Sequence, residues 1–101
     1  MKSASIDFAA LNRRAVKQLP AVLMKFLPGG LVRGQEYIAR NPTRPDHHLG
    51  SFKINLQTGR WADFATGDAG GDIISLVAYV QNTGQLEAAR LVLEAIGGGH
   101  A

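Results

Sequence analysis

The sequence contains no cysteine in 101 residues. This absence excludes disulfide bonds and any zinc site built on thiolates. Charged residues make up only 19% of the chain and hydrophobic residues 46%, a composition typical of a folded domain. No long apolar run is present, because the longest, residues 73–80, is too short to span a bilayer. The first residues lack a secretory signal, so we expect a cytoplasmic protein without a membrane partner.

Length limits the number of domains, and net charge limits the classes of partner. A chain of this size forms one domain at most, which we expect over residues 1–97, followed by a flexible tail at 98–101. The formal charge of +3 is a mild basic excess. Such an excess is compatible with a polyanionic partner, but many small basic domains bind no nucleic acid.

Apolar residues recur at helical spacing in four segments. Ser5 or Asp7 is suited to cap the first helix, and Pro20 ends that helix or begins the second. Asp72 is suited to cap the third helix and Thr83 the fourth. The predicted helices extend over residues 7–18, 20–27, 72–81 and 84–96.

Three segments are typical of strands, at residues 35–40, 51–55 and 59–64. The last two form a hairpin, because the turn residues Asn55 to Gly59 separate them and glycine adopts a positive φ at no steric cost. In the return strand, residues 60, 62 and 64 point to one face and residues 61 and 63 to the other. The sequence therefore predicts an α+β domain in which a three-stranded antiparallel sheet packs against helices.

The central segment combines this hairpin with a glycine-rich helix start. The pieces are Ser51-Phe52-Lys53-Ile54-Asn55, Gly59-Arg60-Trp61-Ala62-Asp63-Phe64 and Gly67-Asp68-Ala69-Gly70-Gly71-Asp72-Ile73-Ile74-Ser75-Leu76. Leu27-Pro28-Gly29-Gly30 and Glu87-Ala88-Ala89-Arg90 flank them. Over roughly residues 19–97 the combination resembles the N-terminal zinc-ribbon-type domain of DNA primases, above all the version in phage and plasmid primase-helicases.

The resemblance also shows where this chain departs from the family. Metal-binding members use three cysteines and a histidine, which would fall near Asn41, Arg44, Phe64 and Gly67. None of these residues is a zinc ligand of that kind, so we expect the fold without the metal and without any cofactor. Phe64 is expected to fill part of the vacated space, replacing metal stabilisation by apolar burial.

The resemblance implies a role in nucleic-acid binding, for which the residues offer candidates. Trp61 and Tyr37 can stack on unpaired bases, or else pack in the core, where Phe52 and Phe64 are also expected. Basic side chains on one sheet face can follow a phosphate backbone; alternatively, they are solvated charges that protect edge strands. The basic candidates are Arg33, Arg40, Arg44, Lys53 and Arg60.

Other motifs carry little chemistry. Gly70-Gly71-Asp72 is interpreted as a tight turn before a capped helix, with anion binding as the alternative. Asp46-His47-His48 is interpreted as a solvent-exposed loop, with metal or phosphate contact as alternatives. No nucleophile–base set and no room for a metal-dependent catalytic domain are found, so we expect a protein that is not an enzyme and has no catalytic residues.

Two functions follow as hypotheses. The first is a DNA-binding accessory domain in the priming or replication of a phage, plasmid or other mobile element. It would contact single-stranded template through a basic sheet face and would have a primase or helicase module as a possible partner. The second is a protein-interaction module that binds a replication or host defence protein without binding DNA, which an exposed apolar patch on the last helix would favour.

Overall fold

The computed structural model describes residues 6–45 and 49–97, and in these the chain forms four helices and an antiparallel sheet. The helices are α1 (Phe8–Lys17), α2 (Leu19–Phe26), α3 (Ile73–Gln81) and α4 (Gln85–Ala95). The strands are β1 (Leu31–Arg33), β2 (Glu36–Ala39), β3 (Phe52–Asn55), β4 (Trp61–Asp63) and β5 (Ala69–Gly70). Neighbouring strands in the sheet are also neighbours in sequence, in the order β1-β2-β3-β4-β5. The predicted tail at 98–101 and the loop of Asp46, His47 and His48 lie outside the described residues.

The predicted α+β architecture is confirmed, but the prediction of three strands is wrong, because the sheet has five. The two strands that were missed are β1 and β5, which have three and two residues. All residues of β1 are exposed, so they lack the alternation that marks a half-buried strand. Alanine and glycine in β5 have low strand propensity. Both strands therefore exist through pairing with a neighbour rather than through local preference.

Two of the predicted helix caps are confirmed. The Ala10 N–H donates to Asp7 Oδ1 at 3.1 Å, and the Ser75 N–H donates to Asp72 Oδ1 at 2.8 Å. Pro20 lies in the first turn of α2, where its missing N–H costs no helical hydrogen bond. These helix starts could be predicted because each depends on residues at most three positions apart in the sequence.

The predicted cap of the last helix is wrong. Gly84, rather than Thr83, precedes α4, and no side chain caps it. Asn82 adopts a left-handed conformation with φ of 53°, and the Thr83 N–H donates to the Ala78 carbonyl at 3.0 Å. Thr83 is therefore part of the end of α3, since its backbone satisfies a terminal carbonyl there.

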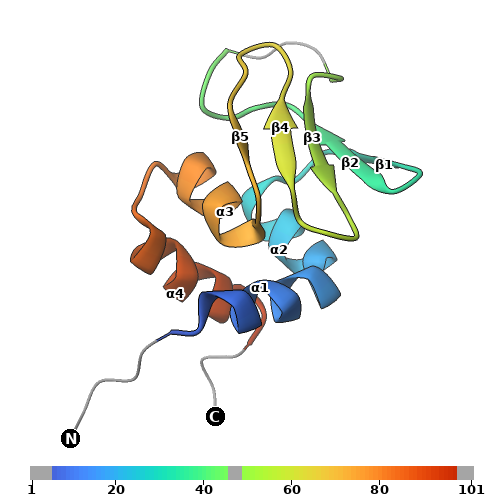
Figure 1. The fold of residues 1–101 in the computed structure, drawn as a ribbon. Helices are drawn as coiled ribbons and strands as arrows, with labels where there is room; N and C mark the ends of the chain where they lie inside the picture. The colour runs from blue at the N-terminus through green and yellow to red at the C-terminus, as the bar shows by residue number, and fades with distance from the viewer. Residues whose placement is uncertain (1–5, 46–48, 98–101) are drawn as a thin grey trace, which may run out of the picture.

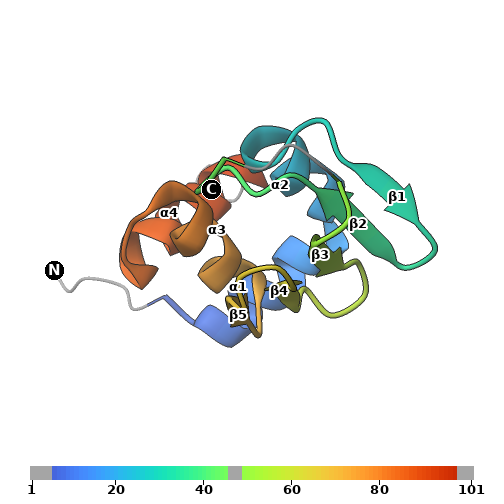
Figure 2. The ribbon, with the colours of Figure 1, turned by 90° about the horizontal axis from the view of Figure 1, so that it is seen from above.

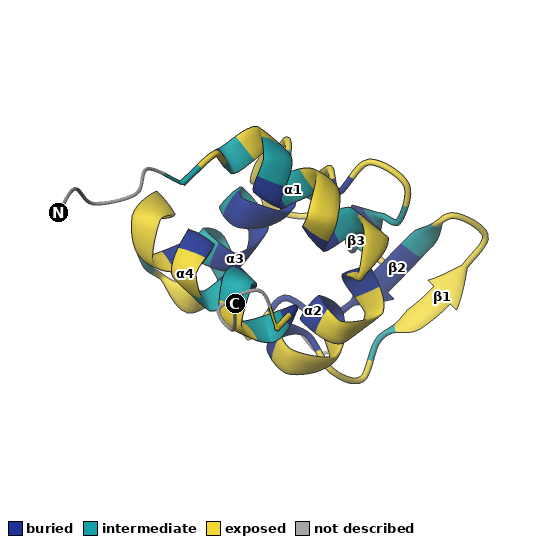
Figure 3. Cartoon of the chain, turned by 90° about the horizontal axis from the view of Figure 1, so that it is seen from below, coloured by how far each residue is buried: buried dark blue, intermediate teal, exposed yellow. Residues whose placement is uncertain are grey.

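The sheet has one covered face and one open face. Figure 1 shows the helices gathered below the sheet, and Figure 2 shows the strands following an arc with α2 and α3 on its inner side. The buried positions of the helices point toward this interior, whereas β1 at the edge is exposed (Figure 3). The register aligns Tyr37, Ile54 and Trp61 side by side on the covered face. All three are buried and belong to the main core.

Trp61 is a core residue, held from three sides. Trp61 is 6% exposed; its ring centre lies 4.7 Å from that of Tyr79, with the two planes tilted by 34°, and it meets Phe52 edge-on at 6.0 Å. Its Nε1–H donates to Ser75 Oγ at 3.0 Å. A Cβ on Gly70 would lie 2.4 Å from this Nε1, so only glycine allows the backbone of β5 to lie this close to Trp61. The core interpretation of Trp61 is confirmed, and its selection as a nucleic-acid-binding residue is not supported by this burial.

Tyr37 is likewise structural. Its hydroxyl donates to the Leu27 carbonyl and accepts from the Gly30 N–H at 3.0 Å. The ring is buried, with 9% exposed, and ties the end of α2 to β2. Neither aromatic residue chosen for base stacking therefore presents a free ring face to solvent.

No helix in the described part of the chain has both the length and the apolar character needed to cross a membrane.

Candidate nucleic-acid interface

The face of the sheet opposite the helices, here called the outer face, is defined by the strand register. Lys53 pairs with Ile38 on one side and with Ala62 on the other, and Ala62 pairs with Ala69. Because side chains alternate along a strand, these residues point away from the core row that contains Trp61. Lys53 is half-buried and separates the fully buried Phe52 and Ile54, as this alternation requires.

Four of the predicted basic residues belong to the outer face. Arg33 pairs with Glu36 in the register, while Arg60 and Arg40 directly precede β4 and follow β2, where continued alternation places them on this face. Arg33, Arg40 and Arg60 are exposed. With Lys53 between them, the cations extend over about 13 Å along the strands, since Arg40 is four residues from Glu36 and each residue rises about 3.3 Å.

One carboxylate interrupts this basic face. Lys53 Nζ lies 3.8 Å from Glu36 Oε1, and the side chains are 33% and 45% exposed. An ion pair with this length and exposure contributes little to stability and does not prevent Lys53 from contacting another anion. The four cations of this face therefore outnumber the carboxylate of Glu36, and the face is net positive.

A hollow of about 400 Å³ lies on the outer face beside Phe64, and we call it the Phe64 hollow. Phe64 is 71% exposed, and Lys53 Nζ lies 5.8 Å from the centre of its ring. The hollow is lined by Glu36, Lys53, Asn55, Arg60, Trp61, Ala62, Phe64, Ala69, Gly70 and Gly71.

The predicted core position of Phe64 is wrong. The Phe64 N–H donates to the Ser51 carbonyl at 2.8 Å, which extends the β3–β4 pairing by one residue and keeps the alternation. Asp63 therefore points inward and Phe64 outward. The alternation of residues 60, 62 and 64 is visible in the sequence, and this signal identifies Phe64 as a surface aromatic residue once Trp61 is assigned to the core.

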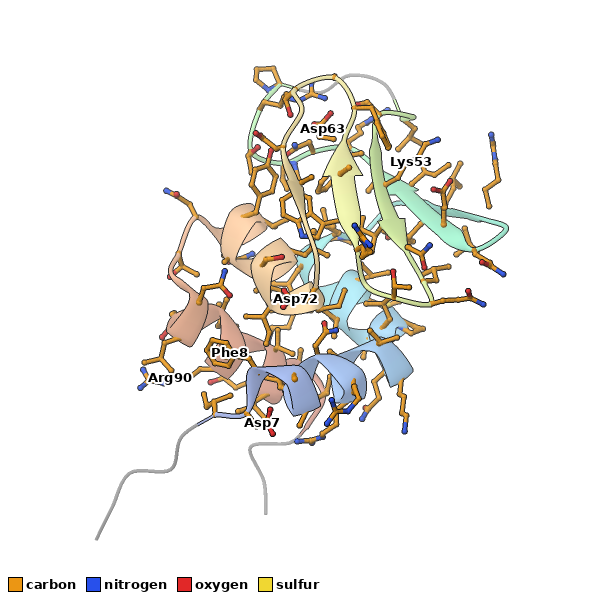
Figure 4. The ribbon with its side chains drawn as sticks, in the orientation of Figure 1. Asp7, Phe8, Lys53, Asp63, Asp72 and Arg90 are labelled. Atoms are coloured by element: carbon orange, nitrogen blue, oxygen red, sulfur yellow. The ribbon has the colours of Figure 1, made fainter. Side chains whose placement is uncertain are left out.

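Arg44, the fifth basic candidate, binds a buried carboxylate within the protein. Its Nε lies 3.0 Å from Asp63 Oδ2 and its Nη2 lies 3.2 Å from Asp63 Oδ1, a two-point ion pair. Nη2 also donates to Ser51 Oγ at 3.1 Å. Figure 4 shows Asp63 at the far end of β4 from the helices α1 and α4. The guanidinium of Arg44 is therefore already bound within the protein, where it stabilises the fold.

Asp63 is the centre of a polar group that also contains Asn41, Arg44 and Tyr79, here called the Asp63 cluster. Asn41 Nδ2 donates to Asp63 Oδ2 at 2.7 Å and lies 2.8 Å from the Tyr79 hydroxyl. Burial of Asp63 raises its pKa, but hydrogen bonds from Asn41, the Ala65 N–H and Arg44, with the charge of Arg44, outweigh it. The pKa of Asp63 is therefore lowered, and the cluster contains a buried, ionised carboxylate.

The Asp63 cluster joins three separate parts of the chain. Asn41 and Arg44 come from the segment after β2, Asp63 ends β4 and Tyr79 lies on α3. The Tyr79 hydroxyl donates to Asp68 Oδ2 at 2.7 Å and so reaches the turn before β5. The cluster thus fixes both chain segments that flank the end of the sheet.

The four residues that the resemblance places at zinc-ligand positions, Asn41, Arg44, Phe64 and Gly67, do not fit a zinc ion. Arg44 is a cationic donor, Gly67 has no side chain and Phe64 points to the outer face. Asn41 uses its amide on Asp63 and Tyr79. Within residues 6–45 and 49–97, no group of three or more His, Cys, Asp or Glu side chains is arranged to hold a metal ion.

The glycine-rich turn before α3 is a capped helix start, as interpreted from the sequence. Asp72 Oδ1 accepts the Ser75 N–H, and Asn12 Oδ1 from α1 accepts the Ile73 N–H at 2.7 Å. Two of the N–H groups that an anion would need are therefore already used within the protein.

An apolar groove of about 380 Å³ lies between α2 and the β1–β2 hairpin, and we call it the α2–β1 groove. Met24 and Val32 on its sides are 75% and 67% exposed. On α4, Leu86 is the exposed large apolar residue among those described, at 52%. The apolar surface therefore gathers at α2 and β1 rather than on the last helix. The groove is lined by Pro20, Leu23, Met24, Pro28, Gly29, Gly30, Val32, Tyr37 and Leu56.

Comparisons of this chain with family models, with curated proteins and with solved structures found no significant match.

Proposed function

We propose that this chain is a non-catalytic, DNA-binding accessory domain in the priming or replication machinery of a phage, plasmid or other mobile element. It contacts single-stranded template through the outer face and works in the cytoplasm beside a primase or helicase module. The observation that carries the binding proposal is the row of four cations on one sheet face that none of the described helices covers. The link to priming rests on the resemblance of residues 51–76 to primase zinc-ribbon domains.

The physical basis is neutralisation of phosphates. Each Lys or Arg that contacts a phosphate releases condensed counterions, so affinity falls as salt rises. Arg33 and Arg60 lie at one end of the outer face, Lys53 in the middle and Arg40 at the other end. This arrangement offers contacts along a strand path, which suits a flexible single strand better than a single anion.

The test is a titration of fluorescently labelled single-stranded DNA, followed by anisotropy at several salt concentrations. We expect binding at tens of micromolar protein or tighter, with an affinity that falls as salt increases. The double variant Lys53→Glu/Arg60→Glu should lose at least ten-fold in affinity. The matched control Arg14→Glu/Lys25→Glu changes the net charge equally but alters exposed helix residues, and it should bind nearly as the parent does.

Two results would contradict the proposal. One is the absence of salt-sensitive binding by the parent protein at these concentrations. The other is an equal loss in both double variants, because binding would then depend on net charge alone and not on the outer face. Melting curves of both variants establish that each is folded.

A second function, a protein-interaction module, is favoured by the α2–β1 groove. Apolar side chains as exposed as Met24 and Val32 in one groove are typical of a surface that another protein covers. The variant Met24→Asp/Val32→Asp separates the two functions. If the parent protein binds no DNA but captures a replication or defence protein that this variant fails to capture, the second function replaces the first.

A further inference from the structure

We propose that the Phe64 hollow is a stacking subsite for one unpaired nucleobase, an inference that rests on the proposed binding of single-stranded DNA. In this arrangement the base lies against the ring of Phe64, and Lys53 and Arg60 contact the neighbouring phosphates. The ligand class of the outer face is then an unpaired nucleotide rather than a duplex.

The exposure of Phe64 is the first observation. Phe64 is 71% exposed, so apolar surface that would stabilise the fold if it were buried stays in contact with water. Phe64 is the aromatic residue among the exposed large apolar side chains of the described chain. Its ring lies on the same face as the four cations, and stacking on a base is what an exposed ring beside a phosphate track provides.

The shape of the hollow is the second observation. Ala62 and Ala69 contribute only methyl groups to its lining and Gly71 contributes no side chain, so these residues leave space beside Phe64. A volume of about 400 Å³ lies in the range of small-ligand sites, which begins at about 300 Å³. Asn55 and Glu36 also line the wall, but Asn55 Oδ1 already accepts the Gln57 and Thr58 N–H groups and Glu36 lies 3.8 Å from Lys53.

The position of Lys53 is the third observation. Its ammonium group is 5.8 Å from the centre of the Phe64 ring and 3.8 Å from Glu36, so one residue serves both the aromatic and the charged part of the face. Figure 4 shows Lys53 on β3, near the middle of the sheet. A nucleotide stacked on Phe64 therefore has a cation within reach of its phosphate.

This geometry favours a single strand over a duplex. A base within a duplex is stacked between its neighbours, and taking it out costs free energy that an unpaired base does not pay. The aromatic ring of Phe64 presents no hydrogen-bond pattern, so we expect little preference among the bases.

The test compares Phe64→Ala with Phe64→Tyr, which keeps an aromatic ring. The probes are a short single-stranded DNA and the same backbone with abasic sites. Phe64→Ala should lower the affinity for the normal strand about five- to hundred-fold, while Phe64→Tyr should stay within about three-fold of the parent. The slope of affinity against salt should not change in Phe64→Ala, whereas Lys53→Ala should reduce it by about one.

The abasic probe isolates stacking from charge. The parent should bind it about as weakly as Phe64→Ala binds the normal strand, and Phe64→Ala should bind both probes alike. Parent-like binding of the normal strand by Phe64→Ala would overturn the subsite while leaving the proposed function intact. If the parent binds neither the normal strand nor the abasic probe, both the subsite and the proposed function are overturned. Melting curves of the Phe64 and Lys53 variants establish that each is folded.

Discussion

Arg44 and Asp63 form an ion pair in which one partner faces water and the other does not. The Arg44 side chain is 26% exposed, whereas Asp63 is fully buried. Removing the arginine therefore leaves a charge inside the protein, while removing the carboxylate leaves a cation that water can reach. The two substitutions are consequently expected to act on stability by different routes.

Arg44→Ala is expected to lower the free energy of unfolding by about 2–3 kcal/mol. The loss approaches that of breaking a buried ion pair, but it is smaller because water can enter the space left by the arginine side chain, which is 26% exposed, and solvate Asp63. Urea denaturation measures it, with Arg40→Ala as the matched control. Arg40 is exposed, so its removal should change stability by at most about 0.5 kcal/mol. Equal effects of the two substitutions would show that the ion pair adds nothing to the fold.

The pH dependence of stability should depend on Asp63. Because its pKa in the folded protein is lowered, the unfolded chain binds more protons than the folded one between the folded pKa and about pH 4. The stabilisation by Asp63 is therefore complete above about pH 4 and is lost as the pH falls through the folded pKa. Melting temperatures from pH 7 to pH 2 should show this loss in the parent and a flatter profile in Asp63→Asn. An unchanged profile in Asp63→Asn would show that another carboxylate controls acid unfolding.

The fold is expected to be independent of metal. Arg44 and Gly67 cannot bind zinc, and Asn41 uses its amide within the Asp63 cluster. We expect the purified protein to contain no stoichiometric zinc by elemental analysis and its melting temperature to be unaffected by a chelator. Loss of structure on addition of the chelator would contradict this interpretation of residues 41, 44, 64 and 67.

Gly70→Ala is expected to destabilise the protein by about 1–3 kcal/mol, because the new Cβ would lie 2.4 Å from Trp61 Nε1 and 2.5 Å from Ser75 Oγ. Thermal melting, with the emission maximum of Trp61, measures the effect. Gly71→Ala is the matched control, since its added Cβ would have no atom of a described residue beyond its two chain neighbours within 4 Å, and its φ is not positive. If Gly71→Ala is as destabilising as Gly70→Ala, backbone freedom and not the contact with Trp61 explains the glycines.

Local interactions explain which elements could be predicted. Asp7 and Asp72 cap their helices through contacts only three residues away, and Asn55 accepts from the Gln57 N–H within the hairpin turn. The alternation around Lys53 likewise depends on neighbours in the sequence. Such features need no knowledge of distant residues, and the α+β architecture and the central hairpin followed from them.

The sequence by itself determined the helices, the hairpin and the alternation of its strands, because these depend on short-range backbone geometry. Tertiary structure alone decided which face of the sheet is covered, and so why Trp61 is buried and Phe64 is exposed. It also decided that Asn41 meets Asp63 across 22 residues and Tyr79 across 38. Contacts at such separations form only when helices and sheet pack together, since burial makes the pairing of each polar group obligatory.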